Sequence, residues 1–195
     1  MRLVVALTGA SGQIYGIRLL EYLSTSDVET HLIISPSARE NIELETDCTP
    51  DYVESLADFC YSHDDFTAPF ASGSFKHDGM VVIPCSIKTA SAIANSLNFN
   101  LIIRAADVSL KERRKLVLVV RETPLHSGHL KMLSSLSEIG AIIFPPVPAF
   151  YAKPRSIDDI VNHSVGRVLD ILGIENDLYR PWTGRESISE RELNL

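Results

Sequence analysis

Two short apolar runs, at residues 80–83 and 115–120, constrain the fold of this chain more than any other feature. Both are uninterrupted, rich in β-branched residues and only four to six residues long, which is typical of strands buried on both faces of a parallel sheet. Polar residues follow each run, with Ser86 after the first and Arg121 and Glu122 after the second. Ligands of open parallel sheets bind at the edge where the strands end. This stretch therefore predicts both a sheet and the position of a site.

The rest of the chain alternates strands and helices, which predicts the α/β class. Further strands are expected at residues 2–7, 29–35 and 141–147, and helices at 14–24, 36–45, 51–59, 87–97, 127–140 and 156–174. Ser156 is the expected N-cap of the last helix, and Gly173 its end. The pattern predicts one doubly wound parallel sheet in a three-layer domain over residues 1–184, followed by a polar tail at 185–195.

Composition excludes several classes of protein. Apolar residues make up 45% of the 195 residues and charged residues 22%, as in ordinary globular domains. The net charge of −7 disfavours binding to nucleic acid or to an anionic membrane. No apolar run approaches the roughly 20 residues that cross a bilayer. Three widely spaced cysteines form no disulfide framework and fit a reducing cytoplasm.

Two loops of small residues follow predicted strands. Gly9, Ala10, Ser11 and Gly12 join a strand to a helix, as a phosphate or flavin loop does, although the full GxGxxG spacing is missing. The alternative is a tight turn in which Ser11 is only the N-cap.

The segment PCSIKT, at residues 84–89, repeats this arrangement on another strand, and Ser35 ends a third. Two small-residue turns at one sheet edge indicate a ligand site more strongly than one turn does, and the alternative is two capped helices. Cys85 is a weaker candidate as a nucleophile, because a helix N-terminus lowers the pKa of a thiol.

Charged and aromatic side chains supply further candidates. Arg104 and Lys111 stand near ends of elements, and Arg121 with Glu122 forms either a buried ion pair or a substrate-facing pair. Tyr151 offers an aromatic wall or core packing.

The sequence offers three more candidates. Arg167 is either a surface residue or a phosphate ligand, and Glu45 ends a predicted helix. His126 and His129 have the spacing of a shared metal site without an evident third ligand.

Eight short motifs occur in a fixed order along the chain: TGASG, ETD, APFASGS, PCSIKT, RAADVSLKERR, VRETP, PAFY and VGRVLDILGI. From Thr8 to about Gly184, this series closely resembles the flavin prenyltransferase family. Members of that family were once classed as aromatic-acid or 3-polyprenyl-4-hydroxybenzoate decarboxylases.

The resemblance implies a flavodoxin-like fold and a defined reaction. Reduced FMN and dimethylallyl monophosphate would give prenylated FMN, with the prenyl group joined to flavin N5 and C6. The product would serve separate reversible decarboxylases, including those of ubiquinone synthesis. The resemblance also implies a metal-independent cytoplasmic homododecamer with sites at subunit interfaces.

The matching motifs assign residues to this site. The positions that would contact FMN are Gly9, Ala10, Ser11, Ser35, Ser86, Ile87, Lys88, Thr89 and Arg104. Those that would bind the prenyl phosphate are Lys111, Arg121, Tyr151 and Arg167, and the catalytic set would be Ser11, Glu45, Lys111, Arg121 and Glu122.

The chemistry of these side chains agrees with that reaction. Lys111, Arg121 and Arg167 carry positive charge that would stabilise a departing phosphate without Mg²⁺. Ring closure at C6 releases a proton, and we hypothesise a relay through Ser11 and Glu122.

Two positions depart from the family pattern. Met132 stands where an Asn is common, and the usual Arg-Trp pair is interrupted as Arg180-Pro181-Trp182.

Two other functions remain as alternatives. One is an FMN-dependent cysteine-type decarboxylase, and the other is a flavin-binding carrier or storage protein without turnover.

Overall fold

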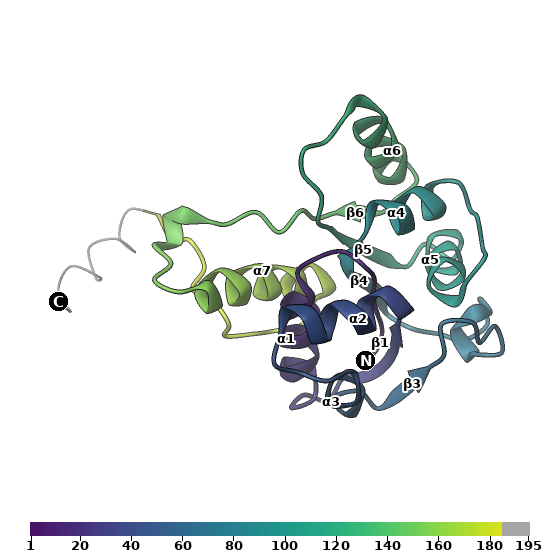
Figure 1. Ribbon diagram of the computed structural model, residues 1–195, viewed down its shortest axis with the longest axis horizontal. Coiled ribbons are helices and arrows are strands. Elements are labelled where there is room, and N and C mark those ends of the chain that lie inside the picture. The colour runs from purple at the N-terminus through teal and green to yellow at the C-terminus, as the bar shows by residue number, and fades with distance from the viewer. Residues whose placement is uncertain (185–195) are drawn as a thin grey trace. The chain divides into compact units, whose positions relative to one another are not determined.

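The computed structural model describes residues 1–184, in which six strands form one sheet (Figure 1). The strands are β1 (Arg2–Leu7), β2 (Glu29–Ile34), β3 (Phe59–Tyr61), β4 (Gly79–Cys85), β5 (Lys115–Val120) and β6 (Ile142–Ile143). All neighbouring strands pair in parallel, in the order β3-β2-β1-β4-β5-β6. The predicted parallel α/β sheet is confirmed.

Helices cover the sheet in two groups, which gives the three layers (Figure 1). The first group is α1 (Gln13–Leu23), α2 (Pro36–Glu45) and α3 (Pro50–Ser55), in which α1 packs on β1 and β4. The second is η1 (Pro69–Ala71), α4 (Ile87–Ala94), α5 (Leu101–Lys111) and α6 (Ser127–Glu138), in which α4 contacts α6 and α5 contacts β5.

The strand order reverses at β1 and β4, and this reversal is where ligands of open α/β sheets bind. Without the three-residue edge strand β3, the sheet has the flavodoxin-like order. Residues 51–59 were predicted to be one helix. Instead α3 ends at Ser55, and Phe59–Tyr61 pairs with β2.

The chain forms two compact units, one over residues 1–146 and a second that begins at Val147. The second unit contains η2 (Phe150–Ala152) and α7 (Ile157–Leu172). Ser156 and Asp159 form a capping box at the start of α7, and Gly173 ends the helix at φ +86°, as predicted. The predicted tail at 185–195 lies outside the described residues, and the domain limit at 184 stays a prediction.

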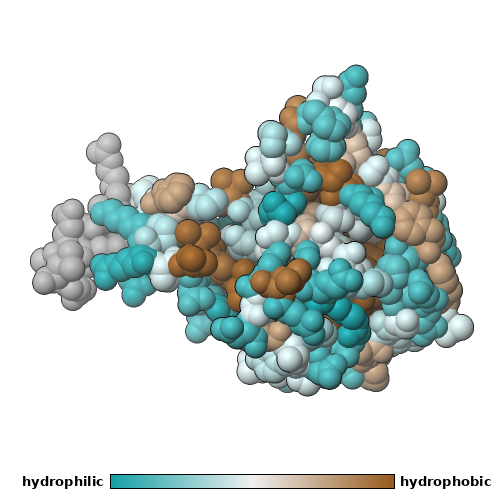
Figure 2. Space-filling model, in the orientation of Figure 1, coloured by the Kyte–Doolittle hydropathy of each residue, from teal (hydrophilic) through white to brown (hydrophobic). Residues whose placement is uncertain are grey.

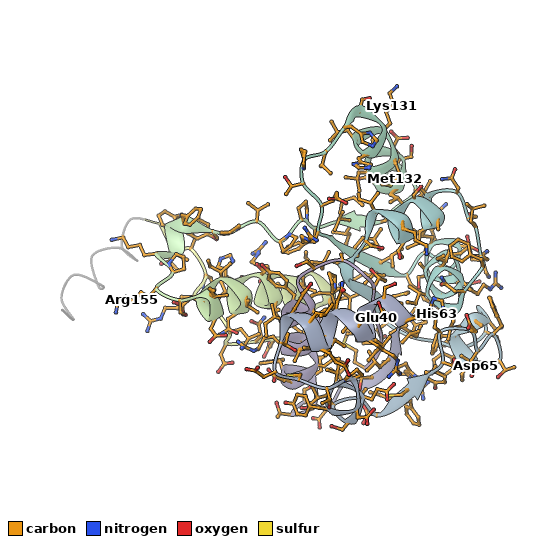
Figure 3. The ribbon with its side chains drawn as sticks, in the orientation of Figure 1. Glu40, His63, Asp65, Lys131, Met132 and Arg155 are labelled. Carbon is orange, nitrogen blue, oxygen red and sulfur yellow. The ribbon has the colours of Figure 1, made fainter. Side chains whose placement is uncertain are left out.

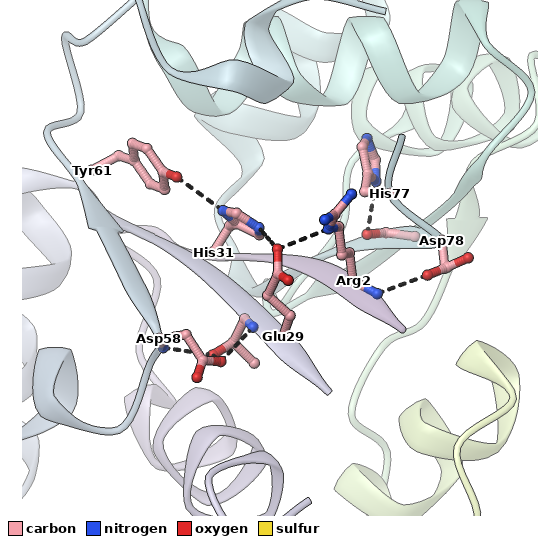
Figure 4. A network of polar contacts seen from close by, with 9 residues as sticks. Arg2, Glu29, His31, Asp58, Tyr61, His77 and Asp78 are labelled. Atoms are coloured by element: carbon pink, nitrogen blue, oxygen red, sulfur yellow. Dashed lines mark hydrogen bonds and ion pairs between the residues drawn. The ribbon is translucent and has the colours of Figure 1, made fainter. Parts of the chain in front are cut away.

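A polar network joins β1, β2 and β3 at the amino edge of the sheet (Figure 4). Glu29 Oε1 accepts from Arg2 Nε at 2.8 Å and pairs with His31 Nε2 at 2.9 Å, while His31 Nδ1 lies 3.0 Å from the Tyr61 hydroxyl. These partners hold the pKa of the Glu29 carboxyl below its usual value. His31 is buried against Phe59 and other aromatic rings, so its role is to pack the sheet.

Candidate functional site

Thr8 joins the loops that follow β1 and β4. Its hydroxyl donates to the carbonyl of Pro84 at 2.8 Å and accepts from the amide of Ser86 at 2.8 Å. The amide of Ser35 donates to the carbonyl of Leu7 at 3.0 Å, which brings in the end of β2. The predicted meeting of small-residue loops at one edge of the sheet is therefore confirmed.

Replacing Thr8 by Val should destabilise the protein by about 1–3 kcal/mol, because the half-buried Ser86 amide loses its partner and the buried Pro84 carbonyl keeps only its bond from the Thr8 amide. Urea unfolding at fixed protein concentration measures the change. Thr25→Val, which removes an exposed hydroxyl bonded to Tyr22, is the control and should cost within about 0.5 kcal/mol. Equal losses in both variants would contradict the role given to Thr8.

The N-terminus of α1 is capped by a distant carboxylate. Glu45 Oε2, at the end of α2, accepts from the amides of Gly12 at 2.7 Å and Gln13 at 3.2 Å. The N-cap residue is Gly12 at φ +104°, so the alternative in which Ser11 is the N-cap of this helix is wrong. A carboxylate is favourable here because the helix dipole is positive at this end. Glu45 thus lies against the amide that follows Ser11.

The backbone of the first loop is held in a fixed shape. Gln13, fully buried, donates from Nε2 to the carbonyls of Thr8 and Ala10, each at 2.8 Å. An added Cβ at Gly9 would lie 2.5 Å from Cβ of Ser37. Only glycine allows this approach of the loop to the first turn of α2.

Two further helices begin at the same edge with a serine cap. Ser35 Oγ accepts from the amide of Ala38 at the start of α2, and Ser86 Oγ accepts from the amide of Thr89 at the start of α4. In the first turn of α4, Ile87 packs against the core and Lys88 is exposed. Small residues and two serine-capped helix starts fit an FMN phosphate and ring, which bind well to free amides and hydroxyls.

Arg121 ties the end of β5 to the first loop. Its amide donates to the carbonyl of Cys85 at 3.2 Å, and its Nε donates to the carbonyl of Ser11 at 3.1 Å. Glu122 is exposed and accepts from the amide of Thr123. A relay between Ser11 and Glu122 stays a hypothesis.

Cys85 does not have the surroundings of a nucleophile. The thiol is fully buried, and burial raises its pKa to about 12, where the N-terminus of α4 was expected to lower it. At neutral pH it is a thiol rather than a reactive thiolate. We therefore assign Cys85 to core packing.

Alkylation of the native protein should leave Cys85 unmodified while the exposed thiol of Cys60 reacts. Mass mapping after treatment with iodoacetamide, with and without denaturant, measures the two sites. The unfolded chain is the control, in which both cysteines should react. If Cys85 of the native protein is alkylated as fast as Cys60, the assignment of Cys85 to core packing is wrong.

Arg104 and Lys111 both lie on α5. Arg104 Nε donates to the carbonyl of Ala71 at 3.0 Å, and its NH1 lies 3.5 Å from Asp107. Lys111 pairs with Glu112 and lies beside Gly73. The APFASGS segment therefore runs along α5.

Within one chain, Lys111 and Arg121 lie near opposite ends of β5. Lys111 ends α5 just before β5 begins at Lys115, which pairs with the first residue of β4. Arg121 follows the last residue of β5. A strand of this length spans about 20 Å, so one copy of the first unit does not bring these two cations to one anion.

The second unit holds an aromatic cluster around two of the predicted substrate residues. The hydroxyl of Tyr151 lies 3.1 Å from His163 Nε2, and its ring meets that of Trp182 edge to face at 5.6 Å. Arg167 NH1 donates to the Tyr179 hydroxyl at 3.3 Å and lies 3.6 Å from Asp170. Tyr179 in turn donates to Asp170.

His163, Asp170 and Tyr179 belong to this cluster but were not predicted from the sequence. His163 stands four residues before Arg167 and Asp170 three after it, so all three share one helix face. That spacing was a readable signal. The contact of Tyr179 with Arg167 is not readable in the same way, since it depends on the turn after α7.

Two departures from the family pattern now have positions. Met132 (labelled in Figure 3) lies on α6 and is partly buried against the core. Trp182 packs on Tyr151 despite the interrupting Pro181.

Within residues 1–184, no three His, Cys, Asp or Glu side chains gather into a possible metal site. The rings of His126 and His129 are 3.6 Å apart, and His126 Nδ1 accepts from the amide of Gly128. In the same range, no helix combines the length and hydrophobicity that crossing a bilayer requires.

The Flavoprotein family model matches residues 1–169. The flavin prenyltransferase UbiX of Archaeoglobus fulgidus is 57% identical over 182 residues, which cover 93% of this chain and 100% of that protein. This chain belongs to the flavin prenyltransferase family. The flavin prenyltransferase UbiX of Thauera aromatica is 55% identical over 99% of this chain and 98% of its own length.

Solved structures of similar proteins have the same fold. AnUbiX (PadA1), in complex with FMN and dimethylallyl pyrophosphate, matches with a TM-score of 0.92 and 50% identity, covering 94% of this chain and 97% of that one. A dodecameric FMN-dependent UbiX-like decarboxylase from Escherichia coli O157:H7 matches with a TM-score of 0.92 and 49% identity, covering 94% and 100%. The FMN-dependent cysteine decarboxylase TvaF shares the fold alone, at 18% identity and a TM-score of 0.63 over 89% and 98%.

Proposed function

We propose that this chain is a flavin prenyltransferase that joins the dimethylallyl group of dimethylallyl monophosphate to N5 and C6 of reduced FMN. The observation that carries the proposal is the convergence of the loops after β1, β2, β4 and β5 at one edge of the sheet. Relatives more than half identical over nearly the whole chain bear the same activity in their names. When bound, reduced FMN supplies the nucleophilic N5 and C6.

We infer that FMN lies against the first loop and the starts of α2 and α4. Glu45 already occupies the first amides of α1. The flavin phosphate is therefore expected at the serine-capped starts of α2 and α4, where Ser35 and Ser86 stand. Gly9 and Ala10 form the first loop, which Gly9 allows to lie against the start of α2, and Thr89 and Arg104 complete the set.

Release of phosphate from the prenyl donor needs positively charged side chains close to the leaving phosphate. We assign this role to Lys111, Arg121 and Arg167, with Tyr151 as a hydroxyl donor. The proton lost on ring closure passes to a nearby oxygen, for which Ser11, Glu122 and the released phosphate are the candidates.

We infer that neighbouring copies complete the site, because Lys111 and Arg121 lie near opposite ends of β5 within one chain. Exposed apolar side chains of the first unit agree with contacts between copies: Leu97, Phe99, Leu130 and Ile139. Figure 2 shows hydrophobic residues in brown on the face in view. A homododecamer, as named for the Escherichia coli relative, is the expected assembly.

We further expect the product to pass to a reversible decarboxylase and the protein to work in the cytoplasm. We expect prenyl transfer to need no metal, because Lys111, Arg121 and Arg167 supply the positive charge beside the phosphate.

Incubation of the protein with reduced FMN and dimethylallyl phosphate, followed by mass measurement of the flavin, tests the proposal. A gain of one five-carbon prenyl unit is expected. Carbon dioxide released from a peptidyl cysteine would favour the decarboxylase alternative instead. FMN binding without either product would leave only a carrier or storage role.

A further inference from the structure

Within the second unit, the ring of Tyr151 packs against Trp182 and its hydroxyl meets His163. Tyr151 lies on the short helix η2 and is 53% exposed. Its hydroxyl meets His163 Nε2 at 3.1 Å, and the two rings cross at 80° with centroids 5.7 Å apart. The direction of its phenol group therefore depends on His163.

His163 is itself firmly placed. It lies in the middle of α7, a helix of 16 residues with a capping box, and its ring meets that of Tyr179 edge to face at 4.8 Å. Burial and the nearby Arg167 lower the pKa of His163 below its usual 6.5. At neutral pH the imidazole is therefore uncharged, with one nitrogen that donates and one that accepts.

The number of protons available on Tyr151 and His163 indicates which of the two groups donates in their hydrogen bond. A phenol has a single proton, and a phosphate oxygen of the prenyl donor can only accept. If Tyr151 donated to His163, it would have no proton left for the substrate. If His163 Nε2 carries the proton and donates to the phenol oxygen, the phenol proton is free.

We propose that His163 is a positioning residue that donates from Nε2 to the Tyr151 oxygen and so directs the Tyr151 hydroxyl at the phosphate of the prenyl donor. This inference rests on the proposed function, because it takes Tyr151 as a substrate ligand. His163 does not touch the reacting atoms.

The experiment measures the affinity of dimethylallyl phosphate for the protein loaded with oxidised FMN, so that binding is read without turnover. His163→Leu should weaken this affinity about tenfold, which is the usual effect of one lost hydrogen bond. His163→Gln should restore most of it, because the amide also donates. His63→Leu, a change at a histidine paired with Asp64, is the control and should leave affinity unchanged.

A double-mutant cycle with Tyr151→Phe separates positioning from general packing. Once the phenol oxygen is gone, His163→Leu should change the affinity by less than about twofold. FMN affinity and circular dichroism of each variant report on folding. A tenfold loss that persists beside Tyr151→Phe, or a Gln variant as weak as the Leu variant, would overturn the proposal.

The proposed function and this inference fail in different ways. If the wild type binds dimethylallyl phosphate but forms no prenylated flavin, the function is wrong while the cycle still tests His163. If the wild type forms prenylated flavin and the cycle shows no coupling, only the role of His163 is wrong.

Discussion

Replacing Lys111 by Met should lower prenyl transfer at least about a hundredfold, which is the usual cost of removing one group that stabilises charge in a transition state. The Lys111 side chain is 48% exposed at the end of α5, so the fold should not depend on it. FMN affinity should stay unchanged, because Lys111 is assigned to the phosphate of the prenyl donor and not to FMN. Steady-state rates and flavin titration measure the two effects.

Lys131→Met is the matched control, since Lys131 is an exposed lysine on α6 (Figure 3). It should leave the rate of prenyl transfer unchanged. If the rate of prenyl transfer of the Lys111 variant stays within about threefold of the wild-type rate, Lys111 does not stabilise the transition state.

Gly16→Ala should cost about 3 kcal/mol of stability, the upper end of the range for overpacking. An added Cβ at Gly16 would lie 2.4 Å from the carbonyl oxygen of Ile83 and 3.0 Å from Cγ of Leu7. The first of these is a backbone atom of β4, so it cannot turn aside as a side chain does. Such a loss is large beside a typical total of about 5–15 kcal/mol.

Gly140→Ala separates crowding from backbone strain. Gly140 has φ +108°, and a Cβ there would meet nothing within 4 Å. The cost should be only about 1 kcal/mol, from the left-handed backbone alone. Urea unfolding of both variants at one protein concentration makes the comparison, and equal losses would show that α1 is not tightly packed on the sheet.

Local signals predicted much of the fold correctly. The buried run at residues 115–120 coincides with β5, and Ser156 and Gly173 bound α7 as expected. Each of these depends on neighbours in the sequence. The strand predicted at 141–147 shortened to Ile142–Ile143, because two prolines follow closely.

The sequence could not predict features that depend on distant contacts. Phe59–Tyr61 is only three residues long and forms a strand because it pairs with β2. Glu45 caps a helix that begins more than thirty residues earlier. The family resemblance implied that Lys111 and Arg121 share a site at a subunit interface, and the sheet register shows that the two residues are far apart within one chain.

Mixed assemblies of two inactive variants test whether neighbouring copies share a site. Lys111→Met and Arg121→Met subunits, each inactive alone, are mixed under conditions that exchange subunits. A site that takes Arg121 from one copy and Lys111 from another should then regain about a quarter of the wild-type rate of prenyl transfer, as random assembly predicts. If subunits exchange and the mixture stays as inactive as either variant alone, the two cations do not meet across copies and the account is wrong.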